Sequence, residues 1–149
     1  MDQLNTYDQD FYQWTLEQAK AIEDRNLNIL DWANLKEEIE ALGRSEYNAV
    51  VSLLLKEIEH LLKIDYVPIP DCKNKWTAEV IAFKKGIKRK ISPSMKPKLE
   101  IEFEEIYTDA REIVEAEYKI TLPKESPYNL DQLLNHESTT DYLSRRSIC

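Results

Sequence analysis

The stretch DWANLKEEIEALGRSEYNAVVSLLLKEIEHLLK, residues 31–63, decides the fold of this chain. Apolar residues recur in it every three or four positions, the period of one helix face, at Leu35, Ile39, Leu42, Val50 or Val51, Leu54, Ile58 and Leu61. Asp31 is the expected N-cap, because its carboxylate can accept from the free amides of a first helical turn. Gly43 marks a kink or a change of packing partner, since glycine costs about 1 kcal/mol relative to alanine inside a helix. The stretch therefore predicts one long helix to about Lys63.

Similar apolar spacing predicts helices on both sides of this stretch. They cover about residues 8–24, 74–91 and 94–118, with a short helix at 129–134 capped by Asn129. Pro68 and Pro70 fall in a predicted loop, residues 65–73, and Ser94 is the predicted cap of the fourth helix. We therefore predict an all-α, single-domain bundle of four main helices plus a short C-terminal helix. It covers residues 1–134 and is followed by a mobile polar tail, residues 135–149.

The first helix carries Tyr12, Leu16, Ala19 and Ile22 or Glu23 on one side, which we expect to face the core. Phe11 and Trp14 widen that side. The three tryptophans are expected to anchor helices, because each lies at a helix start or on an apolar stripe. The alternative is a binding groove near the N-terminus, with Tyr7, Asp8, Asp10 and Trp14 at its rim.

Composition limits the classes of protein to which the chain can belong. The chain has 149 residues, 42% of them hydrophobic, and only two glycines, which leaves little material for hairpins or phosphate-binding loops. No apolar run approaches the ~20 residues that span a bilayer, and no secretory signal is recognisable, so we expect a cytoplasmic protein without membrane contact. Cys72 and Cys149 lack metal-ligand or redox spacing. We expect no cofactor.

Charge is strongly segregated along the chain. The net charge is −8, yet residues 71–98 hold nine basic and two acidic residues, a local charge of +7. Lys84, Lys85, Lys88 and Arg89 are expected on one solvated face of the third helix, beside the acidic fourth helix. Such a face can bind nucleic acid phosphates, but the aromatic residues nearby lie on the apolar stripe and offer no stacking platform.

The strongest candidate for a metal-binding motif is the run Glu57-Ile58-Glu59-His60. Glu and His three residues apart are metal ligands in di-iron helical bundles. Such a site needs a second Glu-x-x-His pair, which the chain lacks, so no metal is expected. His60 instead packs at the core edge or bonds a carboxylate. The candidate catalytic cluster is then Glu37, Glu38, Glu40 and His60, which a structural role would also explain.

Several phrases of the chain resemble one bacterial family. They are YDQDFYQW (7–14), LDWANLKEEIEALGRSE (30–46), HLLK (60–63), WTA (76–78), YTDA (107–110) and PYNLDQLL (127–134). Together they are similar to family twenty-nine of the domains of unknown function. The resemblance implies a compact helical bundle and no established activity. Where that family tends to carry serine and glycine, this chain has Lys75 and Lys119.

No complete catalytic set emerges, so the leading hypothesis is a helical bundle that acts by association with itself or with a protein partner. An enzyme or metal-binding protein using the Glu37, Glu38, Glu40 and His60 cluster is the alternative. A nucleic-acid-binding factor using the basic face is the second alternative.

Overall fold

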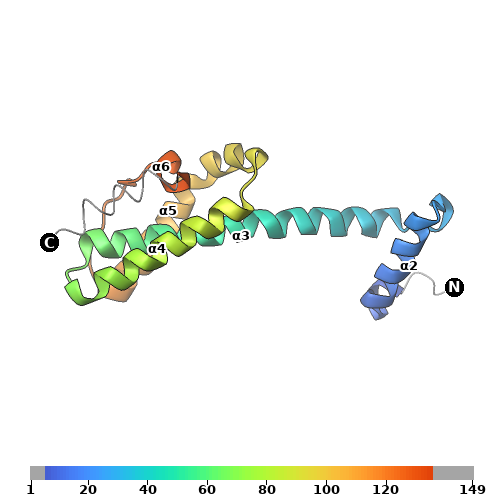
Figure 1. Ribbon diagram of the computed structural model, residues 1–149, viewed down its shortest axis with the longest axis horizontal. Coiled ribbons are helices and arrows are strands. Elements are labelled where there is room, and N and C mark those ends of the chain that lie inside the picture. Colours follow the sequence, from blue (N-terminus) through green and yellow to red (C-terminus); the bar gives the residue numbers. More distant parts are fainter. Residues whose placement is uncertain (1–5, 136–149) are drawn as a thin grey trace. The chain divides into compact units, whose positions relative to one another are not determined.

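The computed structural model describes residues 6–135, and this part of the chain contains helices and no strand. The helices are α1 (Thr6–Gln9), α2 (Phe11–Glu23), η2 (Leu27–Ile29), α3 (Trp32–Tyr66), α4 (Pro70–Lys90), η3 (Pro93–Met95), α5 (Lys96–Tyr118) and α6 (Leu130–Leu134) (Figure 1). The all-α prediction with a short C-terminal helix is confirmed. None of the helices in residues 6–135 has a stretch apolar enough, over the length required, to cross a membrane.

Two compact units make up the chain, Met1–Ser45 and Glu46–Cys149. We call them the N-terminal unit and the bundle unit. Helix α3 contributes to both and runs through Gly43 as one α-helix of 35 residues, as predicted.

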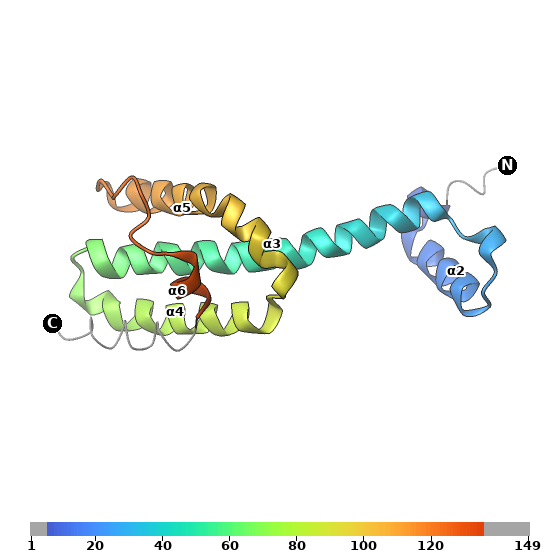
Figure 2. The same cartoon turned by 90° about the horizontal axis from the view of Figure 1, so that it is seen from above.

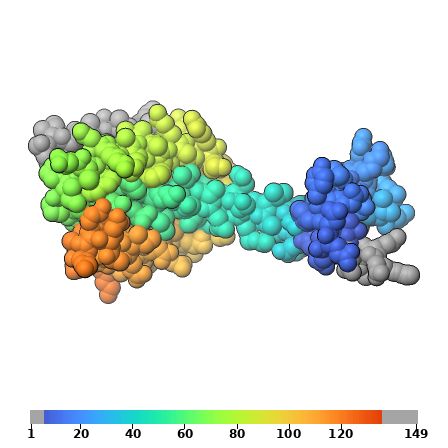
Figure 3. Space-filling model, turned by 90° about the horizontal axis from the view of Figure 1, so that it is seen from below, coloured from blue at the N-terminus to red at the C-terminus, as the bar shows by residue number. Residues whose placement is uncertain are grey.

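The bundle unit places α3 between α4 and α5 (Figure 2). Side chains of α3 and α4 pack directly against each other on the face seen in Figure 3. The core contains the predicted α3 residues Val50, Leu54, Ile58 and Leu61, and α6 adds Leu130 and Leu133. Burial of these apolar side chains is the main stabilising contribution to the unit.

Two predicted helix starts in the bundle unit are wrong. Helix α4 begins at Pro70 inside the predicted loop, because proline is well tolerated at the first helical position, where no amide hydrogen is needed. Ser94 lies in η3 and does not cap α5, whose N-cap Met95 makes no side-chain hydrogen bond. Lys75 is interior to α4, and Lys119 is the C-cap of α5 in the left-handed conformation, φ 54°.

The N-terminal unit is a helical hairpin in which both ends of α2 and the start of α3 are capped. The Asp10 side chain accepts from the Gln13 amide at 3.0 Å and starts α2. At the other end, Arg25 has φ 55°, and the Asn26 amide donates to the Ala21 carbonyl, the arrangement of a Schellman motif. Asp31 caps α3 as predicted, with its Oδ1 accepting from the Asn34 amide at 3.4 Å.

The inward face of α2 matches the predicted one only at Trp14. Its buried residues are Trp14, Gln18 and Ala21, whereas Tyr12, Leu16 and Ala19 are exposed. The expectation of a core-facing Tyr12 and Leu16 is therefore wrong. Of the predicted mobile tail, residues 136–149 lie outside the described residues.

Candidate protein-interaction surface

Polar groups join α1 and α2 of the N-terminal unit to the start of α3. The Trp14 indole Nε1 donates to Asp31 Oδ2 at 3.0 Å, and the Asp31 amide donates to Gln18 Oε1 at 2.7 Å. Tyr7 Oη donates to Glu38 Oε1 at 2.7 Å. Hydrogen bonds from Asn34 and then Trp14 hold the pKa of Asp31 below its usual value, and the bond to Glu38 raises the pKa of Tyr7 to about 12. The carboxylate of Asp31 is thus kept charged where α2 meets the start of α3.

The apolar stripe at the start of α3 does not take part in these contacts. Trp32, Ile39 and Leu42 are 62%, 66% and 68% exposed, and Leu35 is half-buried. The prediction that Ile39 and Leu42 face a core is therefore wrong. On a helix, Asp31 and Glu38 lie to one side of this stripe, so their bonds to Trp14 and Tyr7 turn the stripe outward.

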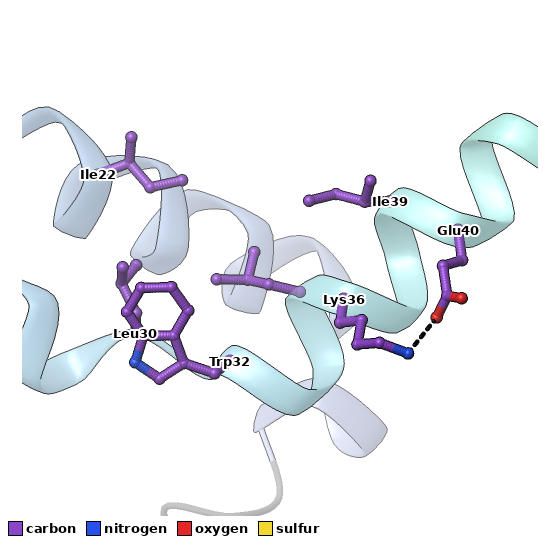
Figure 4. Close-up of a pocket in the computed structure, with 7 residues that line it drawn as sticks. Ile22, Leu30, Trp32, Lys36, Ile39 and Glu40 are labelled. Carbon is purple, nitrogen blue, oxygen red and sulfur yellow. Dashed lines mark hydrogen bonds and ion pairs between the residues drawn. The ribbon is translucent and has the colours of Figure 1, made fainter.

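A pocket of about 470 Å³ opens on this stripe. Figure 4 shows Ile22 of α2 and Ile39 of α3 facing one space, with Leu30 and Trp32 along one side. Leu35 completes the apolar lining. The only charged residues of the lining, Lys36 and Glu40, form an ion pair of 2.8 Å at the edge of the pocket. We call Ile22, Leu30, Trp32, Leu35, Ile39 and Leu42 the apolar face.

The apolar face is large enough for a specific interface. Its six side chains, several of them more than half exposed, present on the order of 600 Å² of apolar surface. A standard protein interface takes about 800 Å² from each partner, a little over half of it apolar. The face therefore supplies the apolar part of such an interface.

The residues predicted as a groove rim have other roles. Tyr7 packs edge-on against Phe11 and Trp14, with ring centroids 5.6 and 4.8 Å apart, and Trp14 is buried. Asp10 is the α2 cap, and Asp8 is exposed in α1. None of these residues lines the pocket on the apolar face.

The members of the predicted catalytic cluster make separate local contacts. Glu37 pairs with Arg44 at 3.2 Å, Glu38 accepts from Tyr7, and Glu40 pairs with Lys36. His60 belongs to the bundle unit, where Nε2 lies 2.5 Å from Glu79 and Nδ1 lies 2.9 Å from the Lys56 carbonyl. Within residues 6–135, no three His, Cys, Asp or Glu side chains are grouped so that they could hold a metal ion. Each member of the predicted cluster thus has a local partner of its own.

One member of the predicted basic face is buried. Lys84 Nζ lies 2.9 Å from Oε1 of the buried Glu57 and donates to the carbonyls of Leu133 at 2.7 Å and Gln132 at 3.0 Å. The expectation of a solvated Lys84 is wrong, because Lys84 continues the apolar stripe through Val80 and Ile87. Burial raises the pKa of Glu57 to about 7, opposed by Lys84, and burial lowers the pKa of Lys84.

The rest of the basic face is exposed, at Lys85, Lys88 and Arg89. Ion pairs of α3 reach α4 through His60 and Lys84 and reach α5 through Lys63 and Glu117, 3.7 Å apart. Within the described chain no ion pair joins the basic α4 directly to the acidic α5.

Comparison with known proteins gives one match. No curated protein and no solved structure matches the chain. A family model described as a domain of unknown function, DUF29, matches residues 6–138, which is most of the chain. The chain therefore belongs to the DUF29 family of domains of unknown function.

Proposed function

We propose that this protein acts by associating with another protein chain through the apolar face of its N-terminal unit. The observation that carries the proposal is the outward orientation of Trp32, Ile39 and Leu42 in a unit whose own helices are joined by polar contacts. Exposed apolar patches of this size, rimmed by polar residues, mark interaction sites in soluble proteins. Helix-in-groove recognition uses the same spacing of apolar anchors.

An enzymatic role has less support. The candidate carboxylates and His60 are engaged in separate ion pairs and hydrogen bonds, each with a local partner. An active site needs several such groups within reach of one substrate.

Photo-crosslinking tests the proposal. A photo-reactive amino acid at position 39 of the full chain, in the cells that naturally make it, is expected to give a crosslinked product, because Ile39 lies at the centre of the apolar face. The same amino acid at position 101 is the matched control, since Ile101 is an 82% exposed isoleucine of α5, outside the apolar face.

The crosslinked chain is identified by mass spectrometry. A defined protein joined at position 39 and not at position 101 supports the proposal, whether that protein is the chain itself or another. No protein product at position 39, or equal products at both positions, refutes it.

A further inference from the structure

We propose that the occupant of the apolar face is a second copy of this chain, packed through its own apolar face. The inference rests on the proposed function and names the partner for it. It is argued from the spacing of the stripe, the apolar area, the flanking charges and the space beside Gly43.

The stripe has the spacing of a coiled-coil seam. Trp32, Leu35, Ile39 and Leu42 are separated by three, four and three residues, the a and d positions of a heptad. Each such side chain packs best between four side chains of a facing helix with the same repeat. A second copy supplies that repeat over the same length.

The N-terminal unit also has too few buried side chains to form a core that would stabilise it alone. Of residues 6–45, only Trp14, Gln18 and Ala21 are buried. Units of about 40 residues usually need a disulfide, a metal or oligomerisation for stability. Pairing two such hairpins converts two exposed faces into the inner layer of a four-helix arrangement.

Size complementarity favours an antiparallel pair. In that orientation Trp32 of one copy lies opposite Leu42 of the other, and Leu35 lies opposite Ile39, so all four stripe positions meet apolar partners. Gly43 follows Leu42, and a Cβ added there would meet nothing within 4 Å. The open space beside Leu42 accommodates the large indole of the second copy.

Charge at the edge of the face is compatible with self-association. The edge carries both signs, Lys36 and Glu40, rather than a run of one sign. Residues 6–45 as a whole hold nine acidic and four basic residues, a net charge of −5. Two copies therefore repel at long range, and salt that screens this repulsion strengthens the pair, whereas salt weakens binding of a basic partner.

Sedimentation equilibrium of the purified full chain tests the inference. The wild type and Ile101→Glu are expected to be dimers at micromolar concentration. Ile39→Glu is expected to raise the dimer Kd by at least about 30-fold, the loss typical of a central interface residue. Both substitutions are at exposed positions, so unchanged far-UV circular dichroism is expected for each. The wild-type Kd is expected to fall as NaCl is raised from about 50 to about 500 mM.

A wild type that is monomeric at about 200 µM overturns the second copy as partner, and a defined heterologous crosslink at position 39 then leaves the proposed function standing. A dimer that Ile101→Glu dissociates and Ile39→Glu does not also overturns the inference.

Orientation is tested by disulfide trapping in a chain carrying Cys72→Ser and Cys149→Ser. A mixture of Trp32→Cys and Leu42→Cys chains is expected to form the mixed disulfide. Homodisulfides alone would overturn the antiparallel arrangement.

Discussion

Replacing Lys84 with methionine tests the buried ion pair of the bundle unit. The substitution keeps the length and apolar stem of the side chain but leaves the Glu57 carboxylate buried with no cation beside it. Breaking a buried pair in this way typically costs 3–5 kcal/mol, about the loss that we expect at pH 9. The carbonyls of Gln132 and Leu133 also lose their ammonium donor.

The cost is expected to depend on pH. The pKa of Glu57 is already raised by burial, and loss of Lys84 raises it further. A carboxyl whose pKa is higher in the folded state than in the unfolded state favours folding at low pH, and this contribution is lost as pH rises above the unfolded pKa of 4.5. The wild type loses the same contribution up to pH 7, the folded pKa of its own Glu57, so the extra cost of Lys84→Met grows only above pH 7, by about 1.4 kcal/mol for each pH unit. At pH 5 the carboxyl is protonated, and we expect only about 1–2 kcal/mol of destabilisation, from the lost carbonyl hydrogen bonds.

Urea unfolding followed by far-UV circular dichroism at pH 5 and pH 9 measures both values. Lys85→Met is the matched control, because Lys85 is the exposed neighbour of Lys84, and it is expected to change stability by less than about 0.5 kcal/mol at either pH. An equal loss for Lys84→Met at the two pH values would refute the argument that an uncompensated Glu57 carboxylate is the cause.

Three further predictions concern single side chains. Glu57→Gln, a neutral mimic of the protonated acid, is expected to raise the free energy of unfolding at pH 8 and to have little effect at pH 5, because the folded pKa of about 7 lies above the unfolded one; urea titrations at the two pH values check this. Lys119→Gly is expected to stabilise the bundle unit by about 1 kcal/mol, since glycine adopts the left-handed conformation without the cost of a Cβ, and a higher thermal midpoint than that of Lys124→Gly checks it. Asp31→Ala is expected to cost about 1 kcal/mol through the lost α3 cap and to free the Trp14 indole, so faster hydrogen exchange should appear at the Asn34 amide and not in α5.

Local signals in the sequence are sufficient to predict most of the helices. Asp31 and Asn129 were recognised as caps because a short polar side chain before an apolar run has one common use, the satisfaction of first-turn amides. The α3 stripe from Val50 to Leu61 was recognised because a helix face with that period must be covered by something apolar.

The same period does not say what covers the stripe. Ile39 and Leu42 have the spacing of core residues, and sequence spacing alone cannot separate a face buried inside the chain from one left for a partner. The contacts that turn the stripe outward, such as Tyr7 to Glu38, join residues 31 positions apart and carry no local signature.

Lys84 was misplaced for a related reason. Lysine is almost never fully buried unless it is paired, so the residue type alone predicts an exposed side chain. Its position was the better guide, because it falls in register with Trp76, Val80 and Ile87. A charged residue in register with an apolar stripe is therefore a sequence signal for a buried ion pair.

The hydrogen bonds from Lys84 to the end of α6 have a consequence for folding during synthesis on the ribosome. A helix of five residues, such as α6, is too short to hold itself together in water, so it depends on acceptor and donor groups from the rest of the bundle. Lys84 leaves the ribosome about 50 residues before the carbonyls of Gln132, Leu133 and Asn135, which accept hydrogen bonds from its ammonium group. Until those residues emerge, Lys84 has Glu57 as its ion-pair partner but lacks the three carbonyls that surround its ammonium group in the complete bundle. The environment of Lys84 is therefore complete only after the last residues of α6 have emerged.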